Sequence, residues 1–157
     1  YKLQLENVDF GEFCKEYLAN KYHEIHFKNF YLEVQIPEDK IFLKIDQKLI
    51  KRLFENLINN SLNHNSEGIT IYFEMQIKKE EVLLHIGDNG KGISDELRKS
   101  IFMPFVTSNE ARTSGKGVGL GMSISKKIVL LHHGSIKLAQ KNKSKYTTEF
   151  IISFPRK

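Results

Sequence analysis

The strongest hydrophobic pattern in the chain lies between Gln47 and Asn63 and predicts one long amphipathic helix. Apolar residues recur there every three or four positions, a spacing that puts their side chains on one helix face. They are Ile50, Leu53, Phe54, Leu57 and then Ser61 or Leu62. A second face of the helix is polar, because Asn56 and Asn60 lie in the middle of the pattern. The chain must therefore supply another layer on which the apolar face can pack.

Alternating apolar and polar residues predict strands that would form this second layer. The predicted strands cover residues 30–36, 41–45, 69–77, 82–86, 136–138 and 148–154. Further helices are predicted after a cap at Asp9, over 94–100, and from about Met122 to His133 with Gly134 at its end and with Ile124, Ile128 and Leu131 buried. This order of elements indicates an α/β (α+β) two-layer sandwich, with helices on one face of a mostly antiparallel sheet.

Composition limits the classes of function. A chain of 157 residues with 40% hydrophobic content is expected to form one domain over residues 1–157. Its net charge of +5 suits an anionic partner such as a nucleotide, whereas its 24 basic residues are too scattered to predict nucleic-acid or membrane contact. The single cysteine, Cys14, excludes an internal disulfide and fits the cytoplasm. No run approaches the ~20 apolar residues of a membrane span, and the first ten residues do not resemble a signal peptide.

The predicted central helix ends in an asparagine-rich stretch, ENLINNSLNHN, over residues 55–65. Helical spacing places Asn56, Asn60 and then Asn63 or His64 on one side. Asparagine is a poor helix former, so these residues cost stability. A solvated, frayed helix end explains Asn63 and Asn65 well but explains Asn56 and Asn60 poorly. Carboxamide oxygens are able to hold a Mg²⁺ ion that keeps water and phosphate as its other ligands.

Two glycine-rich stretches follow the predicted strands. The first, GDNGKGI at residues 87–93, allows close approach of the backbone to a flat group, and Asp88 is an acceptor suited to the exocyclic amino group of adenine. An ordinary turn is the alternative. The second, GKGVGLGMS at residues 115–123, precedes a helix, where free amides suit a polyphosphate; it is neither a Rossmann nor a P-loop motif. A flexible glycine loop is the alternative.

Between them lies IFMPFVTS, residues 101–108, in which Phe102 and Phe105 are either core residues or the hinge of a lid. In the polar loop that follows, Arg112 and Lys116 would then reach the phosphates.

Taken in order, the four segments resemble the N, first G, F and second G boxes of the sensor histidine kinases, within the wider group that includes gyrase and Hsp90. VDFGEF near the start and TTEFIISFP near the end extend the resemblance over nearly the whole chain. It implies a Bergerat sandwich that binds ATP with Mg²⁺. It also implies transfer of the γ-phosphoryl group to a histidine on a separate dimerisation domain, which we expect to be missing here, and a downstream response regulator.

The resemblance also implies roles for individual residues. Asn60 corresponds to the Mg²⁺ ligand, Asn56 to its catalytic partner one turn earlier, and Asp88 to the adenine reader. Lys145 and Thr147 stand where the family usually has glycines. The other implied nucleotide contacts are Asn63, His64, Gly90, Gly92, Ile93, Phe105, Arg112, Lys116, Gly117, Val118, Gly119, Leu120, Gly121 and Thr148.

Position 56 separates transfer from hydrolysis. Members of the wider group that split water have a glutamate there as general base, whereas the amide of Asn56 cannot take a proton. The sequence therefore favours phosphoryl transfer. An anti-sigma-type serine kinase is an alternative, although such proteins generally lack an F box. A non-catalytic adenine-nucleotide-binding regulatory module is another.

None of the six histidines predicts a phosphoacceptor. His23 and Glu24 form the one His-acid pair, without the proline that the family's acceptor segment has, and His23 and His26 are expected at the surface. His132 and His133 are expected to cap a helix end. We expect a monomer in isolation and a dimer as the full protein, whose parent chain would be anchored in the bacterial membrane.

Overall fold

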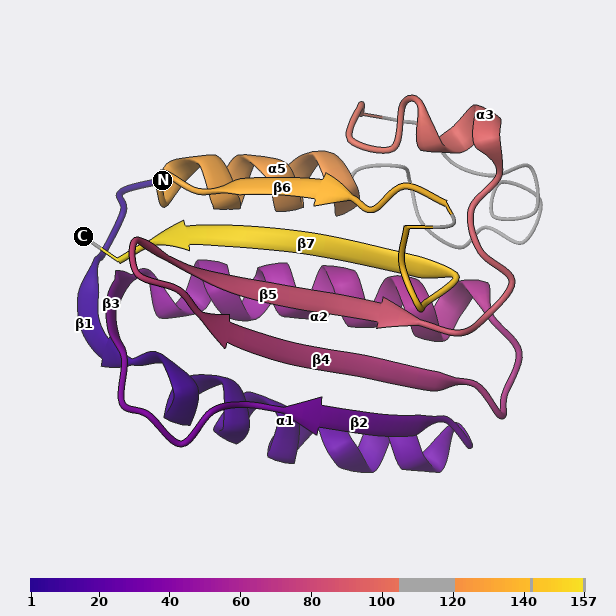
Figure 1. Ribbon diagram of the computed structural model, residues 1–157, viewed down its shortest axis with the longest axis horizontal. Helices are drawn as coiled ribbons and strands as arrows, with labels where there is room; N and C mark the ends of the chain where they lie inside the picture. The colour runs from indigo at the N-terminus through magenta and orange to yellow at the C-terminus, as the bar shows by residue number, and fades with distance from the viewer. Residues whose placement is uncertain (105–120, 142, 157) are drawn as a thin grey trace.

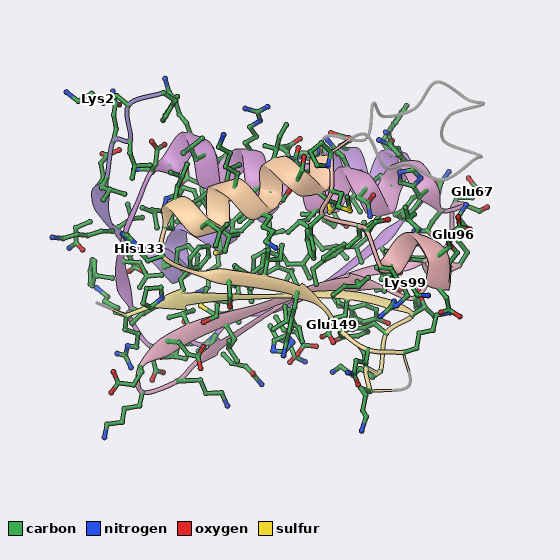
Figure 2. All side chains as sticks on the ribbon, turned by 90° about the horizontal axis from the view of Figure 1, so that it is seen from above. Lys2, Glu67, Glu96, Lys99, His133 and Glu149 are labelled. Atoms are coloured by element: carbon green, nitrogen blue, oxygen red, sulfur yellow. The ribbon has the colours of Figure 1, made fainter. Side chains whose placement is uncertain are left out.

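The computed structural model describes residues 1–104, 121–141 and 143–156, and its centre is a five-stranded sheet (Figure 1). Across the sheet the strands are β2 (Tyr31–Gln35), β4 (Thr70–Ile77), β5 (Glu81–Asp88), β7 (Thr148–Pro155) and β6 (Ser135–Leu138). Only the β2–β4 pair is parallel. Helices lie on one face of the sheet and Glu149 lies on the other (Figure 2). The predicted two-layer sandwich is confirmed.

A second, two-stranded sheet joins β1 (Glu6–Asp9) to β3 (Phe42–Ile45) in antiparallel register. Helix α1 (Phe10–Phe27) starts directly after β1, and the side chain of Asp9 accepts a hydrogen bond from the Glu12 amide at 3.3 Å. The predicted cap is therefore confirmed. Strand β1 was not predicted from the sequence.

Helix α2 (Gln47–His64) buries the face that its sequence pattern predicts. Phe54 is fully buried at its centre, with ring centroids 6.2 Å from Phe13, 5.3 Å from Tyr17 and 5.3 Å from Phe73. These contacts join α1, α2 and β4 in one hydrophobic core. Helix α2 thus lies beside α1 in the helical layer and packs with it on the sheet.

Helix α5 (Gly121–Leu131) begins one residue earlier and ends two residues earlier than predicted, and most of its predicted buried face is confirmed. Ile124 packs against the core as predicted. Ile128 is buried as expected, but Leu131 is 42% exposed and Val129 is buried instead. The left-handed residue that follows is His133, with φ of 60°, rather than Gly134. Gly134 is required for another reason, because a Cβ atom there would lie 2.3 Å from the carbonyl oxygen of Ser153.

His132 ties the end of α5 to the start of α2. Its Nδ1–H donates to the Ile128 carbonyl at 2.8 Å, and its Nε2 accepts from the Asp46 amide at 3.0 Å. The predicted capping of the helix end is confirmed for His132, and the second bond fixes the neutral tautomer. Exposed positions of His23 and His26 agree with the sequence analysis.

The chain termini lie together at one end of the molecule, and the C-terminal ends of α2 and β5 point to the other end, where α3 (Asp95–Arg98) lies (Figure 1). The end of α2, the end of β5 and the start of β7 therefore meet at one place. Within the described ranges, no helix is long and apolar enough to span a membrane.

Candidate functional site

Asp88 is the last residue of β5 and lies almost completely buried, with 2% of its surface exposed. The strand alternation that buries Leu84 and Ile86 turns Asp88 toward α2 as well. One carboxylate oxygen accepts from the Ser61 hydroxyl at 2.6 Å, and the other accepts from the Gly90 amide at 2.9 Å. A carboxylate has about four acceptor positions, so capacity remains for an incoming N–H group.

The backbone carbonyl of Asp88 is held by Thr147, the residue directly before β7. Both the amide and the hydroxyl of Thr147 donate to the Asp88 carbonyl, each at 3.1 Å. Thr148 follows as a buried residue and pairs with Asp88 in the β5–β7 register. A threonine at position 147 therefore adds one hydrogen bond, from its hydroxyl, that a glycine would lack.

Asn65 connects the end of α2 to the glycine-rich turn. Its side-chain oxygen accepts from the Lys91 amide at 3.0 Å, and its side-chain nitrogen donates to the Ser61 carbonyl at 2.9 Å. A Cβ atom on Gly90 would lie 2.0 Å from that oxygen. Gly90 is thus needed for the close approach of Asn65.

Replacing Gly90 with alanine is expected to displace the Asn65 side chain and to lower the free energy of unfolding by about 1 kcal/mol, the usual value of a lost hydrogen bond. Urea unfolding would measure this change. In an Asn65→Ala background the same substitution should cost much less, because the clashing atoms are gone. An equal cost in both backgrounds would contradict the contact.

Asn56 faces the start of α5, where the second glycine-rich stretch ends. Its side-chain nitrogen lies 3.3 Å from the Gly121 carbonyl and 3.3 Å from the Ser125 hydroxyl. Ser125 is fully buried and donates to the same carbonyl at 2.8 Å. Asn60 lies one turn further along α2 and is half-buried, and its side chain makes no hydrogen bond to the described part of the chain.

A polar cluster joins the neighbouring face of α2 to α1. The ammonium group of Lys21, on α1, lies 3.1 Å from the Glu55 carboxylate and 2.8 Å from the Asn59 side-chain oxygen. Burial alone would raise the pKa of Glu55, but hydrogen bonds from Tyr17 and Lys21 hold that pKa below its usual value. Glu55 and Asn59 each precede a candidate site asparagine by one residue, so this cluster occupies a different face of α2 from Asn56, which contacts α5.

The remaining predicted residues fall into two groups. Asn63 and His64 line a shallow depression together with Asn65, Gly90 and Lys91. Gly92 adopts a left-handed φ of 81°, Ile93 packs on the core, and Gly121 begins α5. The rest lie outside the described residues, namely Phe105, Arg112, Lys116, Gly117, Val118, Gly119 and Leu120.

Three contact residues were not singled out as site residues by the sequence analysis. Ser61 was counted only with the apolar stripe, Asn65 only with the asparagine-rich helix end, and Thr147 only as a departure from a family pattern. The one local signal was a serine within an apolar stripe, where a buried hydroxyl needs a partner.

Comparison with known proteins adds independent findings. Residues 45–157 match the family model described as histidine kinase-, DNA gyrase B-, and HSP90-like ATPase. The chain is 35% identical over 122 residues to the sensor protein GtcS of Aneurinibacillus migulanus, covering 78% of this chain and 33% of GtcS. It is 38% identical over 117 residues to the sensor protein KdpD of Clostridium acetobutylicum, covering 74% of this chain and 13% of KdpD. The chain thus spans a third or less of these relatives.

Solved structures of histidine kinases have the same fold as this chain. The catalytic domain of histidine kinase ThkA superposes with a TM-score of 0.83 at 23% identity, covering 98% of this chain and 97% of that one. The mycobacterial sensor histidine kinase MprB superposes with a TM-score of 0.76 at 26% identity, covering 96% and 97%.

Proposed function

This chain belongs to the histidine kinase-, DNA gyrase B-, and HSP90-like ATPase family, and we propose that it binds Mg·ATP and donates the γ-phosphoryl group to a histidine on a separate helical dimerisation domain. It would act as the catalytic part of a two-component sensor kinase. The observation that carries this proposal is that α2 contacts the buried Asp88 carboxylate through Ser61 and the start of α5 through Asn56.

Recognition of adenine follows from the chemistry of Asp88. An ionised carboxylate only accepts hydrogen bonds, and adenine presents an amino group where guanine presents a carbonyl oxygen. Ser61, Gly90 and Thr147 hold Asp88 before any base arrives, so little ordering is required on binding. Thr148 and Gly92 lie at the edge of the proposed adenine site.

The residues on α2 fit a Mg²⁺ ion. The side-chain carboxamide of Asn60 is half-buried and makes no hydrogen bond to the described residues. Its oxygen would be the protein ligand of the ion. Mg²⁺ usually takes one or two protein oxygens and keeps water and phosphate for its other positions. When bound, the ion neutralises charge on the transferring phosphate.

Asn56 supports transfer rather than hydrolysis. Its amide cannot act as a general base for water, and it already contacts the Gly121 carbonyl and Ser125. Phosphoryl transfer depends mainly on positioning and on neutralising charge, which amides and a metal ion are able to supply. The similarity to the sensor proteins GtcS and KdpD also supports a role in phosphoryl transfer.

Partners and location follow from this function. Histidine kinase ThkA, 25% identical to this chain, has been solved with the response regulator TrrA, and we propose that a response regulator acts downstream of this chain too. We further propose a cytoplasmic location, a membrane-anchored parent protein, and a monomeric state in isolation. Sedimentation at micromolar concentration would reveal a dimer if the last proposal is wrong.

Replacing Asn60 with alanine tests the metal site. The expected result is that Mg²⁺ no longer strengthens ATP binding, so that calorimetric dissociation constants with and without Mg²⁺ become similar. Asn59→Ala is the matched control, because Asn59 contacts Lys21 and Glu55 instead of the site. If Asn60→Ala keeps the full Mg²⁺ dependence, the assignment of Asn60 is wrong.

A further inference from the structure

A tyrosine holds the segment before β7 on the outer face of the sheet, away from the helices. The ring of Tyr146 stacks on Tyr72 with centroids 4.2 Å apart and planes 23° from parallel. Its hydroxyl donates to the carboxylate of Glu74, and 8% of the residue is exposed. Tyr72 and Glu74 both lie on β4, with side chains opposite to those of the buried Ile71 and Phe73.

A lysine completes the contact. The Lys145 ammonium group lies 3.0 Å from the same Glu74 carboxylate and 5.1 Å from the centroid of the Tyr146 ring. Burial and the hydrogen bond to Glu74 raise the pKa of Tyr146 to about 12, so the phenol stays a neutral donor at physiological pH. Burial alone would raise the pKa of Glu74, but bonds from Tyr146 and Lys145 lower it. Lys145, Tyr146, Tyr72 and Glu74 are called the Tyr146 latch below.

The residue that follows the latch reaches the candidate site. Thr147 makes both of its hydrogen bonds to the Asp88 carbonyl, as described above. The segment also presses closely on β5, since a Cβ atom on Gly87 would lie 2.4 Å from the Thr148 carbonyl oxygen and 3.2 Å from the Tyr146 ring. The latch residue Tyr146 and the Thr147–Asp88 contact are therefore joined by a single peptide unit.

We propose that Tyr146 is a positioning residue for the nucleotide site, because its anchorage to Tyr72 and Glu74 holds Thr147 in place and thereby fixes Asp88 for the base. The inference rests on the proposed function. Tyr146 does not touch the base itself, and acts through Thr147. Breaking the latch would leave the Asp88 carboxylate present but less ordered, so part of the binding energy would be spent on ordering it.

The first experiment measures nucleotide binding. Tyr146→Phe removes the hydroxyl but keeps the ring on Tyr72, and it is expected to weaken ATP binding about 3- to 10-fold, the cost of ordering one or two side chains. The preference for ATP over GTP should fall with it. Ser153→Ala is the matched control. Ser153 also donates to a carboxylate, that of Glu81, but it lies at the far end of β7 from Tyr146. That variant should bind ATP as the wild type does.

The second experiment needs no nucleotide. Amide hydrogen exchange in the free protein should become faster at Thr147 and Gly90 in Tyr146→Phe and in Glu74→Gln, but not in Ser153→Ala. The double variant Tyr146→Phe/Glu74→Gln should change exchange by less than the sum of the two single changes, because Tyr146 and Glu74 contact each other.

The two readouts separate the two claims. If exchange accelerates but the wild type binds no ATP, the latch stands and the proposed function fails. If the wild type binds ATP and Tyr146→Phe changes neither exchange at Thr147 nor affinity, the latch is refuted. A loss of affinity without faster exchange also refutes it, because the effect would then bypass Thr147.

Discussion

Asp88→Asn is expected to weaken ATP binding by about a hundredfold or more, the largest functional effect of any substitution considered. The asparagine side chain has the same shape but offers an amino group to the amino group of adenine. A site built around a hydrogen bond strongly rejects a partner that cannot make it, because the buried polar groups are left unpaired. Calorimetric titration with ATP would measure the loss.

The same substitution should leave the fold nearly unchanged. The asparagine oxygen would still accept from the Gly90 amide, and its nitrogen would donate to the Ser61 hydroxyl, which then becomes an acceptor. The midpoint of thermal unfolding should therefore shift little. This separates a binding role for Asp88 from a structural one.

Asp46 offers a control for the loss of a buried carboxylate. It is also 2% exposed, and it caps α2 at the other end of that helix, where it accepts from the Leu49 amide at 3.2 Å and the Gln4 amide at 3.0 Å. Asp46→Asn should therefore keep ATP affinity. Equal losses in both variants would show that the effect of Asp88→Asn is not specific.

Phe54→Ala is expected to have the largest effect on stability, a loss of about 3–5 kcal/mol in the free energy of unfolding. Phe54 is fully buried and its ring packs on Phe13, Tyr17 and Phe73. The substitution removes these contacts and leaves a cavity at the junction of α1, α2 and β4. Urea unfolding followed by circular dichroism would measure it.

The control for the stability loss is a second phenylalanine, Phe27, which is the last residue of α1. Phe27 is 86% exposed, so Phe27→Ala should change stability by no more than about 0.5 kcal/mol. Should Phe54→Ala not fold, Phe54→Leu provides a milder change that is expected to lower stability by roughly 1–2 kcal/mol. A cost for Phe54→Leu no greater than that of Phe27→Ala would contradict the placement of Phe54 at the centre of the core.

Most of the fold was predictable because periodicity reports directly on burial. The face of α2 and the buried residues of β4 and β5 follow from repeats of 3.6 and 2 residues. Strand β1 was missed because four residues, ENVD, contain no alternation, and they form a strand only by pairing with β3. The exposed Leu131 was misassigned because α5 ends there, so the helical repeat no longer determines burial.

The site was predictable in part, for a related reason. Asp88 and Asn56 were proposed as site residues because their residue types are unusual in their local patterns, and the match to the histidine kinase family supports the resemblance from which their roles were inferred. Ser61, Asn65 and Tyr146 contribute through contacts with residues 26 to 72 positions away, as in the pairs Ser61–Asp88, Asn65–Lys91 and Tyr146–Glu74. No local pattern in one sequence reports such pairings.

The central claim is that this chain binds adenine nucleotide at the end of α2 and β5. Titration of the wild-type chain with ATP and with GTP, each with and without Mg²⁺, tests it most directly by calorimetry. We predict that ATP binds, that Mg²⁺ strengthens its binding, and that GTP binds far more weakly. Absence of ATP binding, or equal binding of ATP and GTP, would contradict the account.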